Sequence, residues 1–176
     1  MKKLSKIIVE DGIKDISAYN WVRKAARGII VQDNKVLMIY SHSYDDYTFP
    51  GGGVKRDESY QKALYRELKE EVGARGIKII KAFGQTLEVR KSYHHENQQY
   101  RQISKYFICR VTHFGNQQLE EREADHGAMP VWIEPGKALA HNESVKKDVM
   151  HQRRGAKTTI VRENVVLKAL IEEGIK

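Results

Sequence analysis

The sequence predicts one α/β (or α+β) domain. Its 176 residues can bury a sizeable core, and strand-like segments surround one strongly periodic central helix, with a second helical pattern closing the chain. Hydrophobic residues make up 40% and charged residues 31%, an ordinary balance for a soluble globular protein. No repeat, low-complexity segment or linker divides the chain. We therefore expect residues 1–176 to form a single domain.

Two short hairpins are expected in the first quarter of the chain. Residues 7–16 read as two strands around an Asp-Gly turn, and residues 27–41 read as a second hairpin that turns at Asp33 and Asn34. Residues 42–53 carry turn-forming residues and end in three glycines, which predicts a loop. These segments lead into the central helix.

The central helix is expected to begin after Asp57, which can act as its N-cap, and to extend to Val72, where Gly73 stops it. Further strands and helices follow it. The expected elements are strands at residues 77–90 and 101–113, a polar connection at 92–100, an acidic loop at 116–127, a strand at 129–135, a short helix at 136–141 and a closing helix at 160–174.

The composition indicates where in the cell the protein is expected and which charge its partners are expected to carry. The basic start of the chain precedes no apolar stretch of a signal peptide, and no run is long enough to span a membrane. Cys109 is the single cysteine, so an internal disulfide is excluded and a buried, inert thiol is expected. We therefore expect a cytoplasmic protein without membrane association. The net charge of +8 favours anionic partners but does not choose between a nucleotide, RNA and a solvated surface.

Three glutamates of the central helix lie on the wrong side for a solvated face. On a helical wheel with 100° per residue and Leu64 at 0°, Glu71, Glu67 and Glu70 lie at about −20°, −60° and −120°. Glu71 thus lies within the apolar stripe and Glu67 at its margin, whereas the basic side chains point outward. The stripe consists of Tyr60, Leu64, Leu68 and Val72, and the outward residues are Lys62, Arg66 and Lys69.

Carboxylates pressed against a core need partners, because a bare buried charge costs several kcal/mol. A hard divalent cation such as Mg²⁺ or Mn²⁺ would supply one, since it prefers oxygen ligands. The alternative is ion pairing with Lys69 and Arg66 along the helix. The preceding glycines, Gly51 to Gly53, allow the backbone to approach a ligand closely, although a triple glycine can also be a simple tight turn.

These residues complete the signature of a known family, the Nudix hydrolases. The box extends over residues 52–74, and only Ala74 departs from it, in place of a larger aliphatic residue. The residues that match are Gly52, Glu58, Arg66, Glu67, Leu68, Glu70, Glu71 and Gly73. A looser resemblance covers about residues 20 to 140, which leaves the hairpin in residues 1–20 and the helix at 160–174 as additions.

The resemblance implies a mixed β-sheet between helices and the hydrolysis of the pyrophosphate linkage of a nucleoside diphosphate derivative with Mg²⁺ or Mn²⁺. It also implies roles for single residues. Glu67, Glu70, Glu71 and the carbonyl of Gly51 would hold metal, Arg66 would orient a glutamate, and Glu58 would support the ligands from behind. Gly52 and Gly53 would lie against the substrate.

Other candidates rest on position alone. Arg23 and Arg27 could neutralise phosphate charge. Glu71 is our first choice as metal ligand or general base, with the acidic loop as the alternative; this loop offers Glu120, Glu121, Glu123 and Asp125, which are more often solvated. His94 and His95 are adjacent and read as loop residues rather than a metal pair. Tyr93 and Trp132 read as rim and core residues.

The expected activity is that of a MutT-like pyrophosphohydrolase acting on a nucleoside triphosphate. A non-catalytic Nudix module that binds a nucleotide or RNA is the alternative, but it would be expected to lose box glutamates. An RNA end is permitted by the basic charge and not favoured, because the sequence shows no aromatic-rich basic patch. The sequence leaves open the substrate, the general base, the number of metal ions and the oligomeric state, for which the N-terminal hairpin could supply a homodimer interface.

Overall fold

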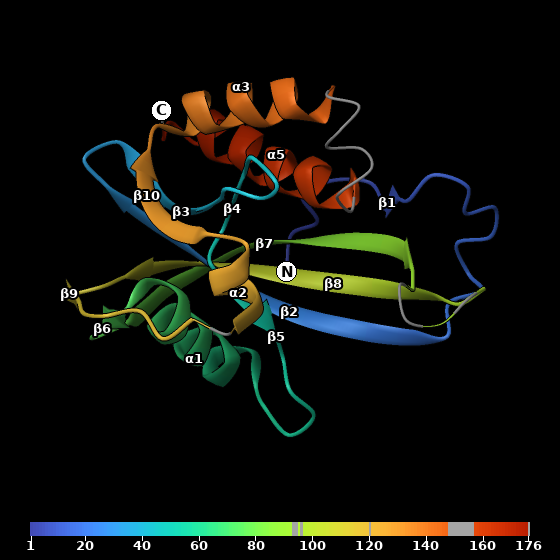
Figure 1. Ribbon diagram of the computed structural model, residues 1–176, viewed down its shortest axis with the longest axis horizontal. Helices are drawn as coiled ribbons and strands as arrows, with labels where there is room; N and C mark the ends of the chain where they lie inside the picture. The colour runs from blue at the N-terminus through green and yellow to red at the C-terminus, as the bar shows by residue number, and fades with distance from the viewer. Residues whose placement is uncertain (93–94, 96, 120, 148–156, 176) are drawn as a thin grey trace.

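In the computed structural model, a strongly curved mixed β-sheet lies between helices (Figure 1). The structure describes residues 1–92, 95, 97–119, 121–147 and 157–175. Its strands are β1 Ile8–Val9, β2 Trp21–Gln32, β3 Lys35–Ser41, β4 Asp46–Thr48, β5 Gly51–Gly53, β6 Ala74–Arg75, β7 Lys78–Lys91, β8 Gln99–Arg110, β9 His113–Phe114 and β10 Ala128–Ile133. Its helices are α1 Tyr60–Val72, α2 Glu121–Asp125, α3 Pro135–Lys146 and α5 Lys157–Glu172.

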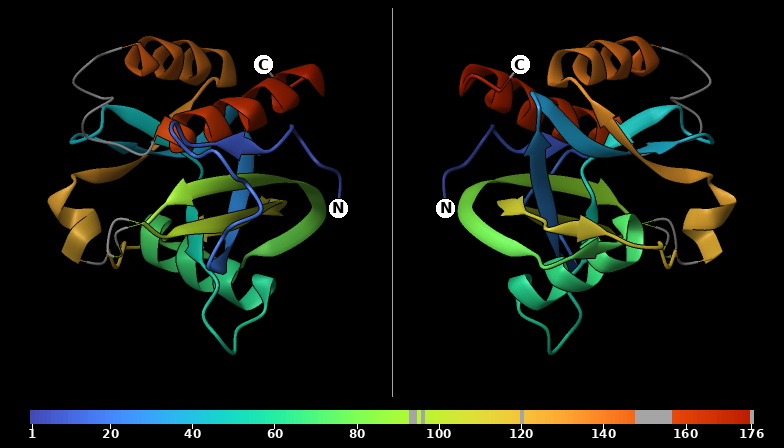
Figure 2. Two further views of the ribbon diagram at one scale, coloured as in Figure 1. Left: turned by 90° about the vertical axis from the view of Figure 1, so that its right-hand side faces the viewer. Right: turned by 90° about the vertical axis from the view of Figure 1, so that its left-hand side faces the viewer.

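The sheet has the order β1-β7-β8-β2-β3-β10, with β4 added to β3 and β5 added to β2. The pairs β7–β8, β2–β3, β2–β5 and β3–β10 are antiparallel, whereas β8 runs parallel to β2. Helix α1 covers one face, and α3 and α5 cover the other (Figure 2). The predicted fold class, with a mixed sheet between helices, is confirmed.

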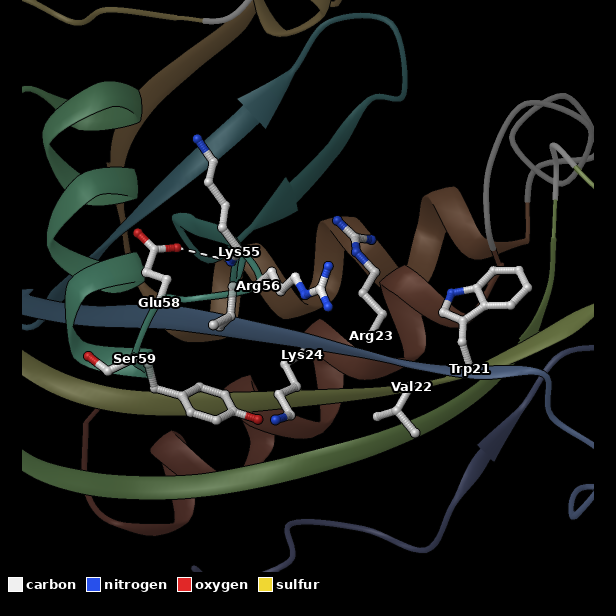
Figure 3. Close-up of a pocket in the computed structure, with 10 residues that line it drawn as sticks. Trp21, Val22, Arg23, Lys24, Lys55, Arg56, Glu58 and Ser59 are labelled. Carbon is white, nitrogen blue, oxygen red and sulfur yellow. Dashed lines mark hydrogen bonds between the residues drawn. The ribbon is translucent and has the colours of Figure 1, made fainter.

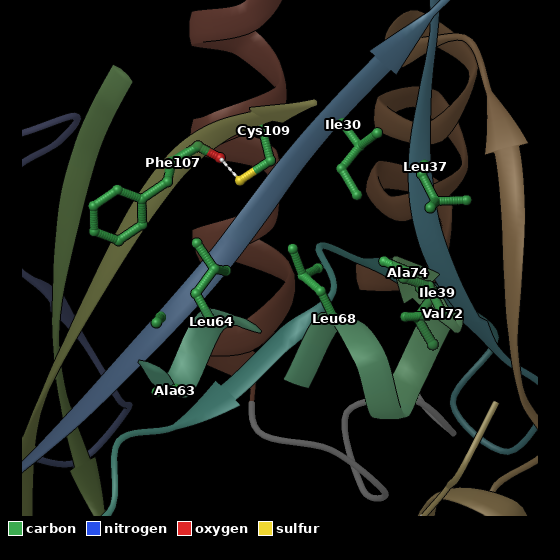
Figure 4. Packing of buried hydrophobic residues seen from close by; sticks show 11 residues of the cluster. Ile30, Leu37, Ile39, Ala63, Leu64, Leu68, Val72, Ala74, Phe107 and Cys109 are labelled. Carbon is green, nitrogen blue, oxygen red and sulfur yellow. Dashed lines mark hydrogen bonds between the residues drawn. The ribbon is translucent and has the colours of Figure 1, made fainter. Parts of the chain in front are cut away.

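The central strand β2 sorts the two halves of the core by its alternation. Ala26 and Ile30 face α1, whereas Ile29 faces α5, because successive side chains of a strand point to opposite faces. Figure 4 shows the cluster between α1 and the sheet, which contains Ile30, Leu37, Ile39, Leu64, Leu68, Val72, Phe107 and Cys109. The second cluster contains Ile29, Met38, Phe49, Tyr106, Leu167 and Leu170. The apolar stripe predicted for α1 therefore packs on the sheet as expected.

The predicted turn at Asp33 and Asn34 and the predicted burial of Cys109 are both confirmed. Asp33 and Asn34 have φ values of 49° and 60°, the left-handed conformation that a two-residue hairpin turn demands. Cys109 is buried, and the burial raises the pKa of its thiol to about 12, so it is uncharged at neutral pH and a poor nucleophile. In the described residues, no helix combines the length and apolarity that crossing a membrane requires.

The predicted N-terminal hairpin is wrong. Only Ile8–Val9 forms a strand, and it pairs in parallel with Glu88 and Val89 of β7. Glu10 continues this contact, because its N–H donates to the Val89 carbonyl at 2.9 Å and its carboxylate accepts from the Lys91 N–H at 2.9 Å. The long β7 edge thus supplies the hydrogen bonds that the second half of the hairpin was expected to supply.

The loops predicted at 42–53 and 116–127 are not irregular throughout. The first contains β4 and β5, which add to the edges of β3 and β2, and the second contains α2. Short strands of this kind depend on a partner edge far away in sequence, so a local pattern does not reveal them. The strands predicted at 77–90 and 101–113 correspond to β7 and β8. The helix predicted at 136–141 is longer than expected, because α3 extends from Pro135 to Lys146.

Helix α1 begins two residues later than predicted, with Ser59 in place of Asp57 as its N-cap. The Ser59 hydroxyl accepts a hydrogen bond from the Lys62 N–H at 3.2 Å. The C-terminal stop is as predicted, because Gly73 has a φ of 66° and its N–H donates to the Leu68 carbonyl.

Replacing Ser59 with alanine is therefore expected to cost about 1 kcal/mol of unfolding free energy, the usual value for an N-cap hydroxyl. Asp57→Ala is the matched control, because Asp57 is exposed; its cost is expected to stay within about 0.5 kcal/mol. Urea denaturation of the two variants would measure both values. A larger loss of unfolding free energy in Asp57→Ala than in Ser59→Ala would show that Asp57 is the N-cap.

Candidate active site

The glycines of β5 bring backbone against the central strand and against α1. Gly51 has a φ of 131°, and a Cβ there would lie 2.2 Å from the Ala26 carbonyl oxygen. At Gly52, a Cβ would lie 2.5 Å from the carboxyl group of Glu67. Any side chain at these two positions would therefore push β5 away from β2 or displace the glutamate. The glycines form a strand whose backbone borders a carboxylate, rather than a simple tight turn.

Arg66 is the centre of the hydrogen-bond network on this face of α1. Its Nε and Nη2 donate to the two carboxylate oxygens of Glu58, each at 3.0 Å. Its Nη1 donates to Glu67 at 2.7 Å and to Glu70 at 3.2 Å, and its Nη2 also donates to the Gly53 carbonyl at 3.0 Å. One guanidinium thus connects the loop before α1, strand β5 and the helix itself.

The network explains how the helix tolerates its glutamates. The hydrogen bonds from Arg66 lower the pKa of Glu58, and the same contacts raise the pKa of Arg66. Glu58 therefore keeps its charge, and with it the ion pair, as the pH falls below the usual range for a glutamate; the pairing is lost only as the pH falls through the lowered pKa. The predicted outward orientation of Arg66 is wrong, because Arg66 forms ion pairs with Glu58, Glu67 and Glu70. Lys69 is exposed.

The three glutamates differ in burial, and the helical wheel ranked them incorrectly. Glu67 is buried, with 9% of its surface exposed, whereas Glu70 and Glu71 are partly buried. The wheel placed Glu71 deepest because it considered α1 alone. In the fold, β5 crosses beside Glu67 at Gly52, and Glu71 instead accepts a hydrogen bond from the Gly51 N–H at 2.6 Å.

The segment Phe49 to Gly51 is held from both sides. Arg27 donates from Nη1 to the carbonyls of Phe49 at 2.8 Å and Gly51 at 3.1 Å. On the other side, Glu163 of α5 accepts from the Phe49 N–H at 3.1 Å, and the buried Arg162 donates to Glu163 and to Glu88 of β7. The closing helix α5, expected from the sequence as an addition to the domain, therefore positions the strand that borders the carboxylates.

The other sequence candidates are distributed as follows. Arg23 is exposed and donates to Gln102 at 3.1 Å. Gln117 and Gln118, which the sequence did not single out, anchor the start of the acidic segment on α1 through the carbonyls of Glu71 and Glu70. The sequence feature that could have indicated these two residues is the run of amide side chains at the start of that segment, residues 116–118. Trp132 is partly buried against the core, as predicted, and Glu121 and Asp125 are exposed. Tyr93, His94, Glu120 and the side chain of Glu123 lie outside the described residues.

A cavity of about 510 Å³ lies between the start of β2 and the loop that leads into α1 (Figure 3). Its cationic lining side chains are Arg23, Lys24, Lys55 and Arg56, and Trp21 and Tyr60 contribute aromatic surface. The acidic group in its lining is Glu58, which is already engaged by Arg66. The fold thus assembles an aromatic and basic patch from two segments that are far apart in sequence, which is why the sequence pattern did not reveal it.

The oxygen atoms on this face of α1 are chemically suited to a hard divalent cation. They are carboxylate oxygens of Glu67, Glu70 and Glu71 beside the carbonyl of Gly51, and such cations prefer oxygen ligands. In the arrangement shown, no three acidic, histidine or cysteine side chains of the described residues converge on one point, because Arg66 donates to Glu67 and Glu70. A metal bound here would compete with Arg66 for these two carboxylates.

The curved mixed sheet, the glycine strand and the glutamate-rich helix define a Nudix domain. The sequence model of the NUDIX domain matches residues 22–153, more than half of the chain. The chain belongs to the Nudix family.

Individual relatives agree with this assignment. An RNA pyrophosphohydrolase of Campylobacter jejuni is 38% identical over 74 residues, which cover 38% of this chain and 45% of that protein. An RNA pyrophosphohydrolase of a Nitratiruptor species is 32% identical over 88 residues, 46% of this chain and 54% of that protein. The chain thus spans about half the length of these relatives. A NUDIX hydrolase structure from Nitrosomonas europaea has the same fold, with a TM-score of 0.51 and 16% identity over 80% of this chain and 90% of that one.

Proposed function

We propose that the protein is a divalent-metal-dependent pyrophosphohydrolase that acts on a nucleoside 5′-triphosphate group. The observation that carries the proposal is the carboxylate face of α1 beside the glycine strand, with Glu67 buried against Gly52 and Glu71 hydrogen-bonded to Gly51. Mg²⁺ or Mn²⁺ bound to these oxygens would lower the pKa of a bound water and neutralise phosphate charge. Membership of the Nudix family and the names of the relatives support this reaction.

Each side chain of the site would have a separate task. Glu67, Glu70 and Glu71 would hold the metal with the Gly51 carbonyl, and Glu71 would also be the first choice to accept the proton from the attacking water. Arg66 would orient Glu67 and Glu70 from the side, with Glu58 behind it. Arg27 supports the Gly51 carbonyl, so we propose it as a residue that positions this ligand rather than as one that contacts phosphate.

The triphosphate could belong to a free nucleotide or to the 5′ end of an RNA, because the reacting group is the same. The sequence alone favoured the free nucleotide. Two observations now favour the RNA end: the relatives named RNA pyrophosphohydrolases, and the cationic cavity with Trp21 and Tyr60 beside the start of α1. A Nudix module that binds without turnover is the weaker candidate, because all of the box glutamates are present.

Product identification across a substrate panel would test the proposal. The panel would contain free nucleoside triphosphates, including 8-oxo-dGTP, together with ADP-ribose, a dinucleoside polyphosphate and a short RNA with a 5′-triphosphate, each with Mg²⁺. Release of pyrophosphate or phosphate from a 5′-triphosphate group, leaving a shortened 5′ end, is the expected result. Cleavage of none of these compounds, combined with a rise in melting temperature on adding one of them, would favour the binding module instead.

A further inference from the structure

The cavity at the N-terminal end of α1 begins beside the carboxylates that would act on the triphosphate and extends away from them toward Ser59 and Trp21. From Ser59, which lines the cavity, to Glu67 is eight residues of sequence, or about 12 Å along the helix. Glu58 lines the cavity and also receives two hydrogen bonds from Arg66, which in turn contacts Glu67 and Glu70. The cavity and the carboxylates are therefore adjacent, because Arg66 lies between Glu58 and Glu67 and the cavity-lining Arg23 lies against Gly53, beside the Gly52 that borders Glu67.

The charge of the cavity is available to a ligand. Arg23, Lys24, Lys55 and Arg56 are all exposed, and none of them forms an ion pair with a described carboxylate. In Figure 3 the side chains of Arg23 and Arg56 extend from opposite walls toward the same space. Two cations that face the same space, with Lys24 and Lys55 also lining the cavity and no ion pair between any of the four and a described carboxylate, favour a polyanionic ligand.

Aromatic surface accompanies these cations at both ends of the cavity. Trp21 lies at the start of β2, where it stacks on Tyr100 with ring centroids 5.4 Å apart and an interplanar angle of 10°. Tyr60 lies at the start of α1, with Lys105 Nζ 4.2 Å from its ring centroid. A groove that combines basic side chains with aromatic rings is the usual arrangement for single-stranded nucleic acid, since the cations contact the phosphates and the rings contact the bases.

We infer that this cavity binds the single-stranded RNA that follows the reacting 5′ end, with Lys55, Arg56, Lys24 and Arg23 contacting its phosphodiester groups. The inference rests on the proposed function, because it assumes that the triphosphate occupies the carboxylate face. It gives that function its preference for RNA: the nucleotides after the first one reach the cavity, whereas a free nucleoside triphosphate has no phosphodiester to place there.

The test compares the double variant Lys55→Ala/Arg56→Ala with Lys35→Ala. Lys35 is an equally exposed cation, but it lies at the β2–β3 turn, at the far end of β2 from Trp21. The probe is a single-stranded oligoribonucleotide of about ten nucleotides with a 5′-monophosphate and a 3′ fluorophore, a length within the range that one single-strand site covers. Binding is measured by fluorescence anisotropy between 50 and 300 mM salt.

The double variant is expected to bind this oligoribonucleotide at least tenfold more weakly than the wild type. Its salt dependence, the slope of log K against log salt, is expected to decrease by about 1.4, since each lost contact to a single strand removes about 0.7. Lys35→Ala should bind as the wild type does. Equal affinity and equal slope in the double variant and the wild type would overturn the inference, and so would an equal loss in Lys35→Ala.

Turnover separates this inference from the proposed function. On a 5′-triphosphorylated RNA, the double variant should lose kcat/KM mainly through a higher KM, while its kcat/KM on a free nucleoside triphosphate should stay within about twofold of the wild type. An equal effect on both substrates would overturn the cavity assignment and leave the proposed function standing. Hydrolysis of neither substrate by the wild type would remove the proposed function, and the binding measurement would still decide whether the cavity holds RNA. A second comparison uses charge reversal: Arg56→Glu is the test variant and Lys35→Glu is its control. Both positions are exposed.

Discussion

Replacing Glu71 with glutamine is expected to lower kcat by about 10²–10⁴-fold, the range for removal of a positioned general base, while the fold stays intact. In the structure, Glu71 accepts a hydrogen bond from the Gly51 N–H at 2.6 Å. The amide oxygen of glutamine can accept the same bond, so the contact between α1 and β5 is preserved. The negative charge is lost, and with it the ability to bind metal strongly or to take a proton.

The measurement is steady-state turnover of the best substrate from the panel, with circular dichroism to confirm the fold. Glu172→Gln, at an exposed position of α5, is the matched control and should behave as the wild type. Raising the Mn²⁺ concentration separates the two roles of Glu71: partial recovery of kcat indicates a metal ligand, and no recovery indicates the base. A variant that retains kcat within a few-fold of the wild type would remove Glu71 from both roles.

Removing divalent metal with EDTA is expected to abolish hydrolysis completely without unfolding the protein. The proposed reaction needs a cation to activate water and to neutralise the phosphates. The fold does not need it, because Arg66 already donates hydrogen bonds to Glu58, Glu67 and Glu70. The carboxylates therefore remain partnered after chelation, and no bare buried charge is left to destabilise α1.

Turnover in EDTA, followed by addition of excess Mg²⁺ or Mn²⁺, would measure this effect, and the melting temperature would report on the fold. We expect activity to return with either metal and the melting temperature to rise as the metal binds the folded state. In Glu67→Gln the metal-induced rise should be smaller, because this glutamate is the most buried of the proposed ligands. Turnover that persists after chelation would contradict a metal-dependent mechanism, and unfolding on chelation would contradict the structural role of Arg66.

Several features of the fold and the site could be predicted from the sequence because their causes are local. The Asp33-Asn34 turn needs only two residues that tolerate a left-handed backbone, and the end of α1 needs only Gly73. The apolar stripe of α1 follows from the helical period, and so does the unusual location of its glutamates on the side that faces the sheet. The spacing of the box from Gly52 to Gly73 was sufficient to indicate the family to which the chain belongs.

The order of burial among the glutamates could not be predicted, because it depends on a strand outside the helix. Gly52 brings β5 against Glu67, and that contact exists only because β5 pairs with β2. The central place of Arg66 has the same origin: its guanidinium reaches Glu58 and the Gly53 carbonyl, which the helical wheel does not contain. The prediction of an N-terminal hairpin was wrong for a related reason, since β1 pairs with the edge of β7, a strand far away in the sequence.

The sequence by itself thus determined the family, the carboxylates proposed to hold metal and the glycines beside them, because these depend on spacing within one short segment. Tertiary structure alone decided which glutamate is buried, how α5 holds the strand at Phe49 through Glu163, and that Trp21 to Lys24 meet Val54 to Tyr60 around one cavity. These outcomes depend on strand pairing and on packing between distant segments, and their energies come from contacts that no local pattern records.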